Sequence, residues 1–173
     1  MVARSISVLG ISHRLQGARK AEHIQHIDDP SYQRYLEKQL LSEQFDFVFE
    51  EATEFGPTIA EKLAAEILGK DHYLDVDPHP KNRTRLGIPD LGNDYTPINP
   101  YEPKSKDFVQ HEHLEGQAKR EQLWVERVQG QSFTSALFIC GYLHTLSLSF
   151  RLNSDGVSVA QASVYMPFHK LNT

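Results

Sequence analysis

Short apolar runs alternate with amphipathic segments along most of this chain. Runs rich in β-branched and aromatic residues are typical of strands and fall at 6–9, 45–49, 72–76, 136–140 and 157–165. Between them, apolar residues recur at helical spacing over 32–41, 58–68, 108–129 and 145–152. Strands that alternate with helices predict an α/β fold of three α/β/α layers with a mostly parallel central sheet. The 173 residues suit one such domain, spanning 1–173.

Residues 78–107 interrupt this alternation. Most of the prolines of the chain fall here, together with several glycines, and no hydrophobic period is present. A long stretch of this kind, placed directly after a predicted strand, favours a loop that borders a functional site. We therefore expect a Pro-rich loop insertion at 78–107 within the single domain.

Two Gly-x-x-His motifs follow predicted strands, one from Gly10 to His13 and the other from Gly141 to His144. Glycine allows the backbone to turn sharply where a strand ends. Each imidazole is then expected just beyond the carboxyl edge of the sheet, where open α/β folds bind their ligands. Either histidine alone is best explained as a hydrogen-bonded loop residue, but the equivalent placement of the pair favours a shared site.

Acidic residues also follow the predicted strands: Glu50 and Glu51 follow the second, and Asp75 and Asp77 the third. Right-handed crossovers place the ends of parallel strands on one edge of the sheet. Neighbouring strands are ~4.8 Å apart, so these carboxylates and the imidazoles are expected to meet. The simpler alternatives are solvated glutamates and aspartates that shape the turn before Pro78.

Imidazole and carboxylate together suit a divalent cation such as manganese, cobalt or zinc. The expected metal ligands are His13, His144 and Glu50. Such an ion lowers the pKa of bound water and polarises a carbonyl, which is the chemistry of a hydrolase. Adjacent residues on an extended strand point to opposite faces, so one of Glu50 and Glu51 could bind metal while the other acts as general base.

The composition narrows the class of protein. The chain is 39% apolar and 24% charged, and its net charge of -5 argues against nucleic acid or an anionic membrane as a partner. No run approaches the ~18 apolar residues of a membrane span, and the first residues lack a signal-peptide pattern. Cys140, the single cysteine, lies in an apolar run and is expected to be buried packing. These features predict a cytoplasmic protein.

Other histidines compete weakly for a metal. His111 and His113 are two residues apart, and on a helix such residues point away from each other. His23 and His26 are three apart in a polar segment and are expected to be exposed. We expect neither pair to bind metal.

Taken in order, the motifs resemble those of the TraB/Tiki group of the EreA/ChaN-like superfamily. The matching features are Gly10 to His13, Glu50-Glu51, Arg120-Glu121-x-x-Trp124 and Gly141 to His144. Asp75 and Asp77 resemble an acidic position that the family often has. The resemblance implies an α/β domain whose site is formed by the paired histidines and a glutamate. It also gives Arg120 a role as an oxyanion or carboxylate clamp, where a solvated helix face is the default explanation.

Members of this superfamily include metal-dependent peptidases, esterases and haem-binding proteins, so the resemblance does not fix one chemistry. The first hypothesis is a metal-dependent hydrolase, peptidase- or esterase-like, acting on a small molecule or peptide. The alternative is a non-catalytic module that binds haem or a small molecule, or a regulatory relative without activity. The last strand could also support a homo-oligomer by edge pairing.

Overall fold

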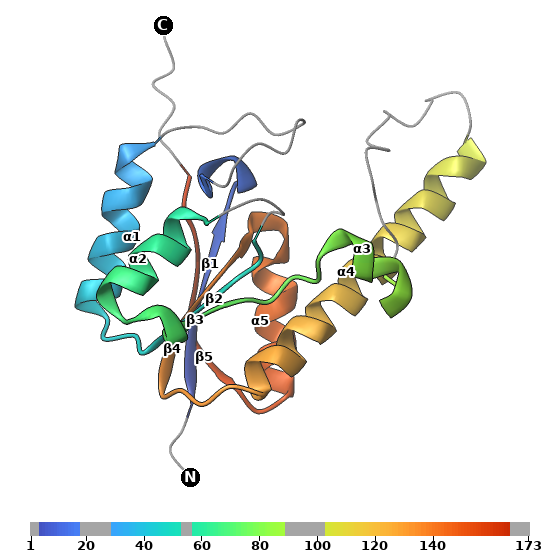
Figure 1. Cartoon of the computed structure of the whole chain (residues 1–173). Helices are drawn as coiled ribbons and strands as arrows, with labels where there is room; N and C mark the ends of the chain where they lie inside the picture. Colours follow the sequence, from blue (N-terminus) through green and yellow to red (C-terminus); the bar gives the residue numbers. More distant parts are fainter. Residues whose placement is uncertain (1–3, 18–28, 53–56, 89–102, 167–173) are drawn as a thin grey trace, which may run out of the picture.

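The computed structural model describes residues 4–17, 29–52, 57–88 and 103–166, with side chains described for all of these except 80, 81, 84 and 103–114. A five-stranded parallel sheet forms its centre, in the order β3-β2-β4-β1-β5 (Figure 1). The strands are β1 (Ser5–Ile11), β2 (Phe47–Glu50), β3 (Tyr73–Asp75), β4 (Ser135–Gly141) and β5 (Ser158–Val164). The predicted three-layer α/β fold with a parallel sheet is confirmed.

Helices cover both faces of the sheet (Figure 1). One face packs against α1 (Pro30–Ser42) and α2 (Ile59–Ile67), the other against α4 (Pro103–Gln129) and α5 (Thr145–Ser154). Side chains alternate along each strand, so Val8 and Phe138 face α4 and α5 while Leu9 and Ile139 face α1 and α2. Burial on both sides explains why these strands read as nearly continuous apolar runs.

Strand order decides which loops become neighbours. The central strands β1 and β4 pair in register, with Gly10 opposite Cys140 and Ile11 opposite Gly141. Strand β2 lies on the other side of β4, with Glu50 opposite Ile139. Because the strands are parallel, their carboxyl ends share one edge of the sheet. Two 3-10 helices, η1 (His13–Leu15) and η4 (Tyr142–His144), therefore stand side by side above β1 and β4.

Local sequence signals account for several element boundaries. The Asp29 side chain accepts a hydrogen bond from the Ser31 amide before α1, and Thr58 accepts one from the Glu61 amide before α2. The sequence predicted that the second strand begins at residue 45, but in the structure it begins at Phe47. Asp46 immediately before it uses its carboxylate to accept hydrogen bonds from the amides of residues 134 and 135.

The predicted loop at 78–107 is in part helical. The 3-10 helix η2 (Lys70–His72) precedes β3. After β3 come a short helix α3 (Pro80–Arg83) and the 3-10 helix η3 (Thr84–Leu86). Helix α4 already begins at Pro103, because proline is well tolerated in a first helical turn. Residues 89–102 of the predicted insertion lie outside the described residues.

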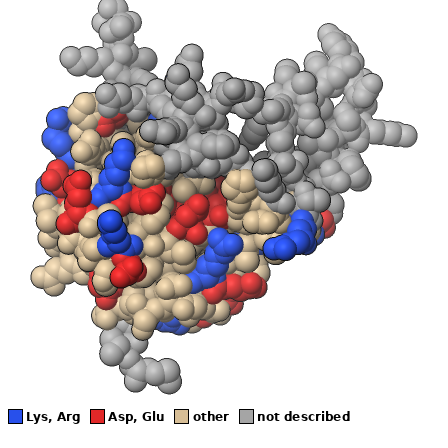
Figure 2. Space-filling view, viewed as in Figure 1, with Lys and Arg blue, Asp and Glu red and all other residues tan. Residues whose placement is uncertain are grey.

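The surface carries both signs of charge. On the face shown in Figure 2, lysine and arginine side chains are interspersed with aspartates and glutamates. Within the described ranges, no helix has the length and apolarity needed to cross a bilayer. Strand β5 is an edge strand that pairs with β1 in the part of the chain that is described, and the expected edge-paired homo-oligomer stays a prediction.

Candidate functional site

The glycine of each Gly-x-x-His motif makes room for the other motif. A Cβ built on Gly141 would lie 2.6 Å from His13 Nε2. A Cβ built on Gly10 would overlap the Thr145 hydroxyl and lie 2.9 Å from the Tyr142 Cα. Neither glycine is among those with positive φ. The sequence-based explanation, a sharp backbone turn, is therefore replaced by close packing: the glycines allow η1 and η4 to touch.

Glu51 is the centre on which the two motifs converge. Its side chain is buried, and its Oε1 lies 3.6 Å from His13 Nε2 and 3.9 Å from His144 Nε2. The same oxygen accepts a 2.7 Å hydrogen bond from Arg120 Nη2. The other oxygen, Oε2, accepts a 2.8 Å bond from the Gly141 amide. Two imidazoles, a guanidinium and a backbone amide thus surround one carboxylate.

These contacts keep the Glu51 carboxylate ionised. Burial alone would raise its pKa, but His13, Arg120 and His144, together with the Gly141 amide, hold the pKa below its ordinary value. An ionised carboxylate accepts hydrogen bonds or coordinates a cation and donates nothing. Glu51 is therefore an anionic centre of the site at neutral pH.

His144 is oriented by a second carboxylate. Its Nδ1 lies 2.7 Å from Glu121 Oε1, and Glu121 also accepts hydrogen bonds from Ser147 Oγ (2.6 Å) and Arg151 Nε (2.9 Å). Burial would raise the pKa of Glu121, but these partners hold it below its ordinary value. An ionised carboxylate requires a donor, so Nδ1 of His144 carries a proton and Nε2 faces Glu51. The Trp124 ring packs edge-on against the imidazole, with centroids 4.9 Å apart.

His13 forms the open side of the site. Its side chain is 34% exposed, compared with 7% for His144. Its Nδ1 lies 3.0 Å from Gln16 Oε1, which again directs Nε2 toward Glu51. Both imidazoles thus use Nδ1 for a protein partner and point Nε2 at the same carboxylate oxygen.

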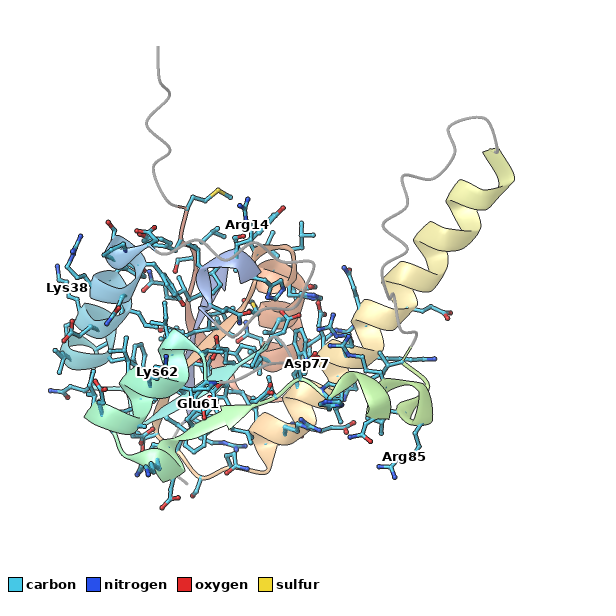
Figure 3. All side chains as sticks on the ribbon, turned by 45° about the horizontal axis from the view of Figure 1, so that its top comes forward. Arg14, Lys38, Glu61, Lys62, Asp77 and Arg85 are labelled. Carbon is cyan, nitrogen blue, oxygen red and sulfur yellow. The ribbon has the colours of Figure 1, made fainter. Side chains whose placement is uncertain are left out.

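Asp77 holds Arg120 in place. Its Oδ1 accepts hydrogen bonds from Arg120 Nε (3.1 Å) and Trp124 Nε1 (3.0 Å), and its Oδ2 pairs with Arg83 and with Arg120 Nη2 (3.0 Å). Figure 3 shows Asp77 beside α4, whereas Arg85 points outward. Burial would lower the pKa of Arg120, but Glu51 and Asp77 raise it above its ordinary value. Asp77 is therefore part of an ion-pair network and not only a turn former.

Glu50 belongs to a different cluster. It is fully buried toward α2, where its Oε1 accepts from Gln16 Nε2 (2.9 Å) and its Oε2 from the Thr58 and Tyr73 hydroxyls. Burial raises its pKa to about 7, against the effect of these three donors. Alternation along β2 explains the separation: Glu50 follows Val48 toward α1 and α2, and Glu51 follows Phe49 toward α4 and α5. It is Glu51, not Glu50, that faces the histidines.

Asp75 stands apart as well. Its Oδ1 accepts hydrogen bonds from the amides of Asp77 (2.9 Å) and Ala52 (3.3 Å), so it shapes the turn after β3. Of the residues singled out from the sequence, the structure brings together His13, His144, Glu51, Asp77 and Arg120. The Glu50 side chain bonds none of these five, and Asp75 is joined to the group through the backbone amide of Asp77.

Sequence reasoning gave no role in the site to four residues that hold it together, although Glu121 and Trp124 belong to the motif that carries the resemblance. They are Gln16, Arg83, Glu121 and Trp124. For Glu121 a signal was present, because it shares the inward face of α4 with Trp124, Val125 and Val128 at helical spacing. A charged residue on an inward face is expected to have a buried partner. Gln16 gave no comparable signal, since it follows a short loop turn.

The remaining candidates from the sequence are Cys140 and two pairs of histidines. Cys140 is buried and free, as expected for a packing residue. His23, His26 and the side chains of His111 and His113 lie outside the described residues.

As they stand, the donor atoms are not close enough together to hold a divalent cation. Two ligands of a tetrahedral ion with ~2.1 Å bonds are ~3.4 Å apart. The distances of 3.6 and 3.9 Å from Glu51 Oε1 to the two Nε2 atoms are slightly longer. Within the described part of the chain, no group of three or more histidine, cysteine, aspartate or glutamate side chains is close enough to hold a metal as it stands. The two Glu51–histidine distances would have to shorten by a few tenths of an ångström, and Arg120 would have to shift.

Comparison with known proteins adds no further constraint. The chain matches no protein-family model, no curated protein and no solved structure. The geometry of the site is therefore the basis for the proposed function.

Proposed function

We propose that this protein is a metal-dependent hydrolase whose site is formed by His13, His144 and Glu51. One observation carries the proposal: both imidazoles spend Nδ1 on a protein partner and direct Nε2 at Glu51 Oε1, at 3.6 and 3.9 Å. Histidines that ligate metals are held in this way, with one ring nitrogen hydrogen-bonded to a carboxylate or amide oxygen and the other free for the ion.

Electrostatics supports a cation between these groups. When both imidazoles are neutral and carry their proton on Nδ1, the two Nε2 atoms and the carboxylate oxygen present lone pairs to the same region, which favours a metal ion there. A divalent ion such as manganese, cobalt or zinc supplies Lewis acidity and lowers the pKa of bound water. Glu51 replaces Glu50 as the carboxylate ligand suggested by the sequence, because Glu50 is held by Gln16, Thr58 and Tyr73.

Arg120 gives the site a fixed positive charge. Its guanidinium contacts both Glu51 and Asp77 and its side chain is 17% exposed. A guanidinium placed beside the reaction centre stabilises negative charge that develops on a carbonyl oxygen. This supports acyl-group hydrolysis of a small-molecule ester or a peptide.

Metal titration of the purified chain tests the proposal directly. Calorimetry with manganese, cobalt and zinc is expected to show one saturable site, and His13→Ala or His144→Ala to weaken it by roughly 10–100-fold or more. His72→Ala is the matched control, because His72 is exposed and bonds the Asp46 carbonyl away from the site. Hydrolysis of a panel of nitrophenyl esters and fluorogenic peptides is then compared with and without the bound ion.

Either of two results would contradict the proposal. The first is the absence of metal binding by the unmodified chain. The second is binding that the His13 and His144 variants leave intact, because the ion would then lie elsewhere.

The ion pair between Arg120 and Glu51 favours a second candidate, a non-catalytic ligand-binding module. With a guanidinium 2.7 Å from Oε1, the carboxylate is already neutralised within the protein. The partly exposed His13 imidazole would then serve as the contact for haem or another small ligand. Haem titration separates the two candidates: a Soret shift that His13→Ala abolishes supports the module, and an unchanged spectrum removes its haem form.

A further inference from the structure

Gln16 is a fully buried polar side chain between the two acidic residues that follow β2. Its Nε2 lies 2.9 Å from Glu50 Oε1 and 2.7 Å from the Glu51 backbone carbonyl. A backbone carbonyl only accepts hydrogen bonds, so the group that faces it must be the amide NH₂. The orientation of the Gln16 side chain is therefore fixed by chemistry.

That orientation determines the protonation pattern of His13. With its NH₂ turned to Glu50 and Glu51, Gln16 presents its carbonyl oxygen to His13 Nδ1 at 3.0 Å. An acceptor at that position requires a proton on Nδ1. In a neutral imidazole the other nitrogen, Nε2, then carries the lone pair.

Glu50 anchors this arrangement from behind. Its carboxylate accepts hydrogen bonds from Gln16, from the Thr58 hydroxyl and from the Tyr73 hydroxyl (2.8 Å). Thr58 is in turn fixed as the N-cap of α2, where its hydroxyl accepts from the Glu61 amide. A chain of hydrogen bonds thus runs from the start of α2 through Glu50 and Gln16 to His13.

We infer that Gln16, anchored by Glu50, is a positioning residue that holds His13 in the Nδ1-protonated tautomer and so keeps Nε2 free toward Glu51. Glu121 gives His144 the same orientation. A glutamine amide and a glutamate carboxylate thus set equivalent tautomers in the two histidines. The inference deepens the proposed function by specifying how the His13 donor is set. It applies equally to the metal-free protein, where it can be measured independently of metal binding.

Long-range ¹H–¹⁵N correlation spectra of the full-length, metal-free chain report the tautomer of each imidazole. The spectra are recorded about two pH units above the ordinary histidine pKa, with His13 assigned by its loss in His13→Ala. We expect His13 and His144 to be protonated at Nδ1 and unprotonated at Nε2. A proton on Nε2 of His13 in the unmodified chain, as the other tautomer or as an imidazolium, would overturn the inference without any variant.

Two substitutions then separate positioning from general damage. Gln16→Met keeps the length but removes both hydrogen-bonding groups, so His13 should become a mixture that includes the Nε2-protonated tautomer while His144 is unchanged. Glu50→Gln retains an oxygen that accepts from the Gln16 amide, so it should preserve the His13 tautomer. Retention of the pure Nδ1-protonated form in Gln16→Met would contradict the inference. A chain that binds no metal yet shows this pattern would refute the proposed function and leave the inference intact.

Discussion

The imidazole of His13 lies against the backbone of Gly141, in space that any larger residue at that position would need. An added Cβ would come within 2.6 Å of His13 Nε2 and 3.4 Å of Glu51 Oε2. The glycine of the second motif thus provides the space that the histidine of the first motif occupies. Two segments far apart in the sequence form one unit because β1 and β4 are adjacent parallel strands.

Gly141→Ala is therefore expected to displace the His13 imidazole while the protein still folds. The imidazole is 34% exposed and can swing outward, so we expect a loss of stability of about 1–3 kcal/mol, together with altered His13 resonances and weaker metal binding. Urea unfolding and calorimetry measure these effects. Gly130→Ala is the control, since its added Cβ meets its nearest atoms at 3.5 and 3.6 Å. Metal binding and His13 signals that match those of the unmodified chain would contradict this account.

Glu121→Gln is expected to lower the metal affinity of the site by changing His144. The substitution removes the negative charge that Nδ1 of His144 contacts at 2.7 Å, so Nε2 becomes a poorer donor. Loss of such an outer partner reduces metal affinity by roughly 10–100-fold. Zinc affinity measured by competition with a chelating dye tests this, and Glu126→Gln on the exposed side of the same helix is the control. Equal affinities for the two variants would show that Glu121 does not act on a metal site.

The sequence was sufficient to predict the fold and the edge of the sheet that carries the site. Apolar runs buried on both faces indicated parallel strands, and the two motifs followed strands that prove to be neighbours. The choice between Glu50 and Glu51 could not be made in the same way. It depends on which face of β2 receives α4 and α5, and a strand that is buried on both sides gives no clue to that.

The supporting residues were hidden for a different reason. A sequence pattern treats polar residues as solvent-facing, yet Gln16 and Glu121 are buried because each has partners from distant segments. Asp77 likewise looked like a turn residue before Pro78 until Arg120 and Trp124 were placed beside it. Such residues become visible only when hydrogen bonds between sequence-distant groups are known.

Arg120→Gln is expected to destabilise the metal-free protein and to increase the stabilisation that a bound cation provides. Without the guanidinium, Glu51 becomes a buried carboxylate lacking its closest cation, so the metal-free protein should lose about 3 kcal/mol of unfolding free energy. A divalent cation would compensate that charge. The rise in melting temperature on adding manganese should therefore be larger for Arg120→Gln than for the unmodified chain. Arg127→Gln, on the same helix and bonded to the Asp75 carbonyl, is the control. A smaller rise than in the unmodified chain would place the cation away from Glu51.

Glu50→Gln is expected to make the protein more stable at high pH. Burial raises the pKa of Glu50 from 4.5 to about 7 in the folded protein. The stability linked to this proton is therefore fully present below 4.5 and is lost as the pH rises through about 7. A shift of this size corresponds to roughly 3 kcal/mol for a fully buried group. Glutamine stays neutral at every pH and keeps an oxygen for the Gln16 amide, so its advantage should grow across that interval.

Urea unfolding of Glu50→Gln and of the unmodified chain, followed by circular dichroism over this pH range, measures the difference in unfolding free energy. Contributions from Glu51 and Glu121 are common to both proteins and cancel in the difference. Glu37→Gln, an exposed carboxylate on α1, should show no growing advantage. A difference between Glu50→Gln and the unmodified chain that is constant with pH would mean that Glu50 does not take up a proton in this interval. Its carboxylate would then be ionised throughout, held by the Gln16 amide and the Thr58 and Tyr73 hydroxyls despite its burial.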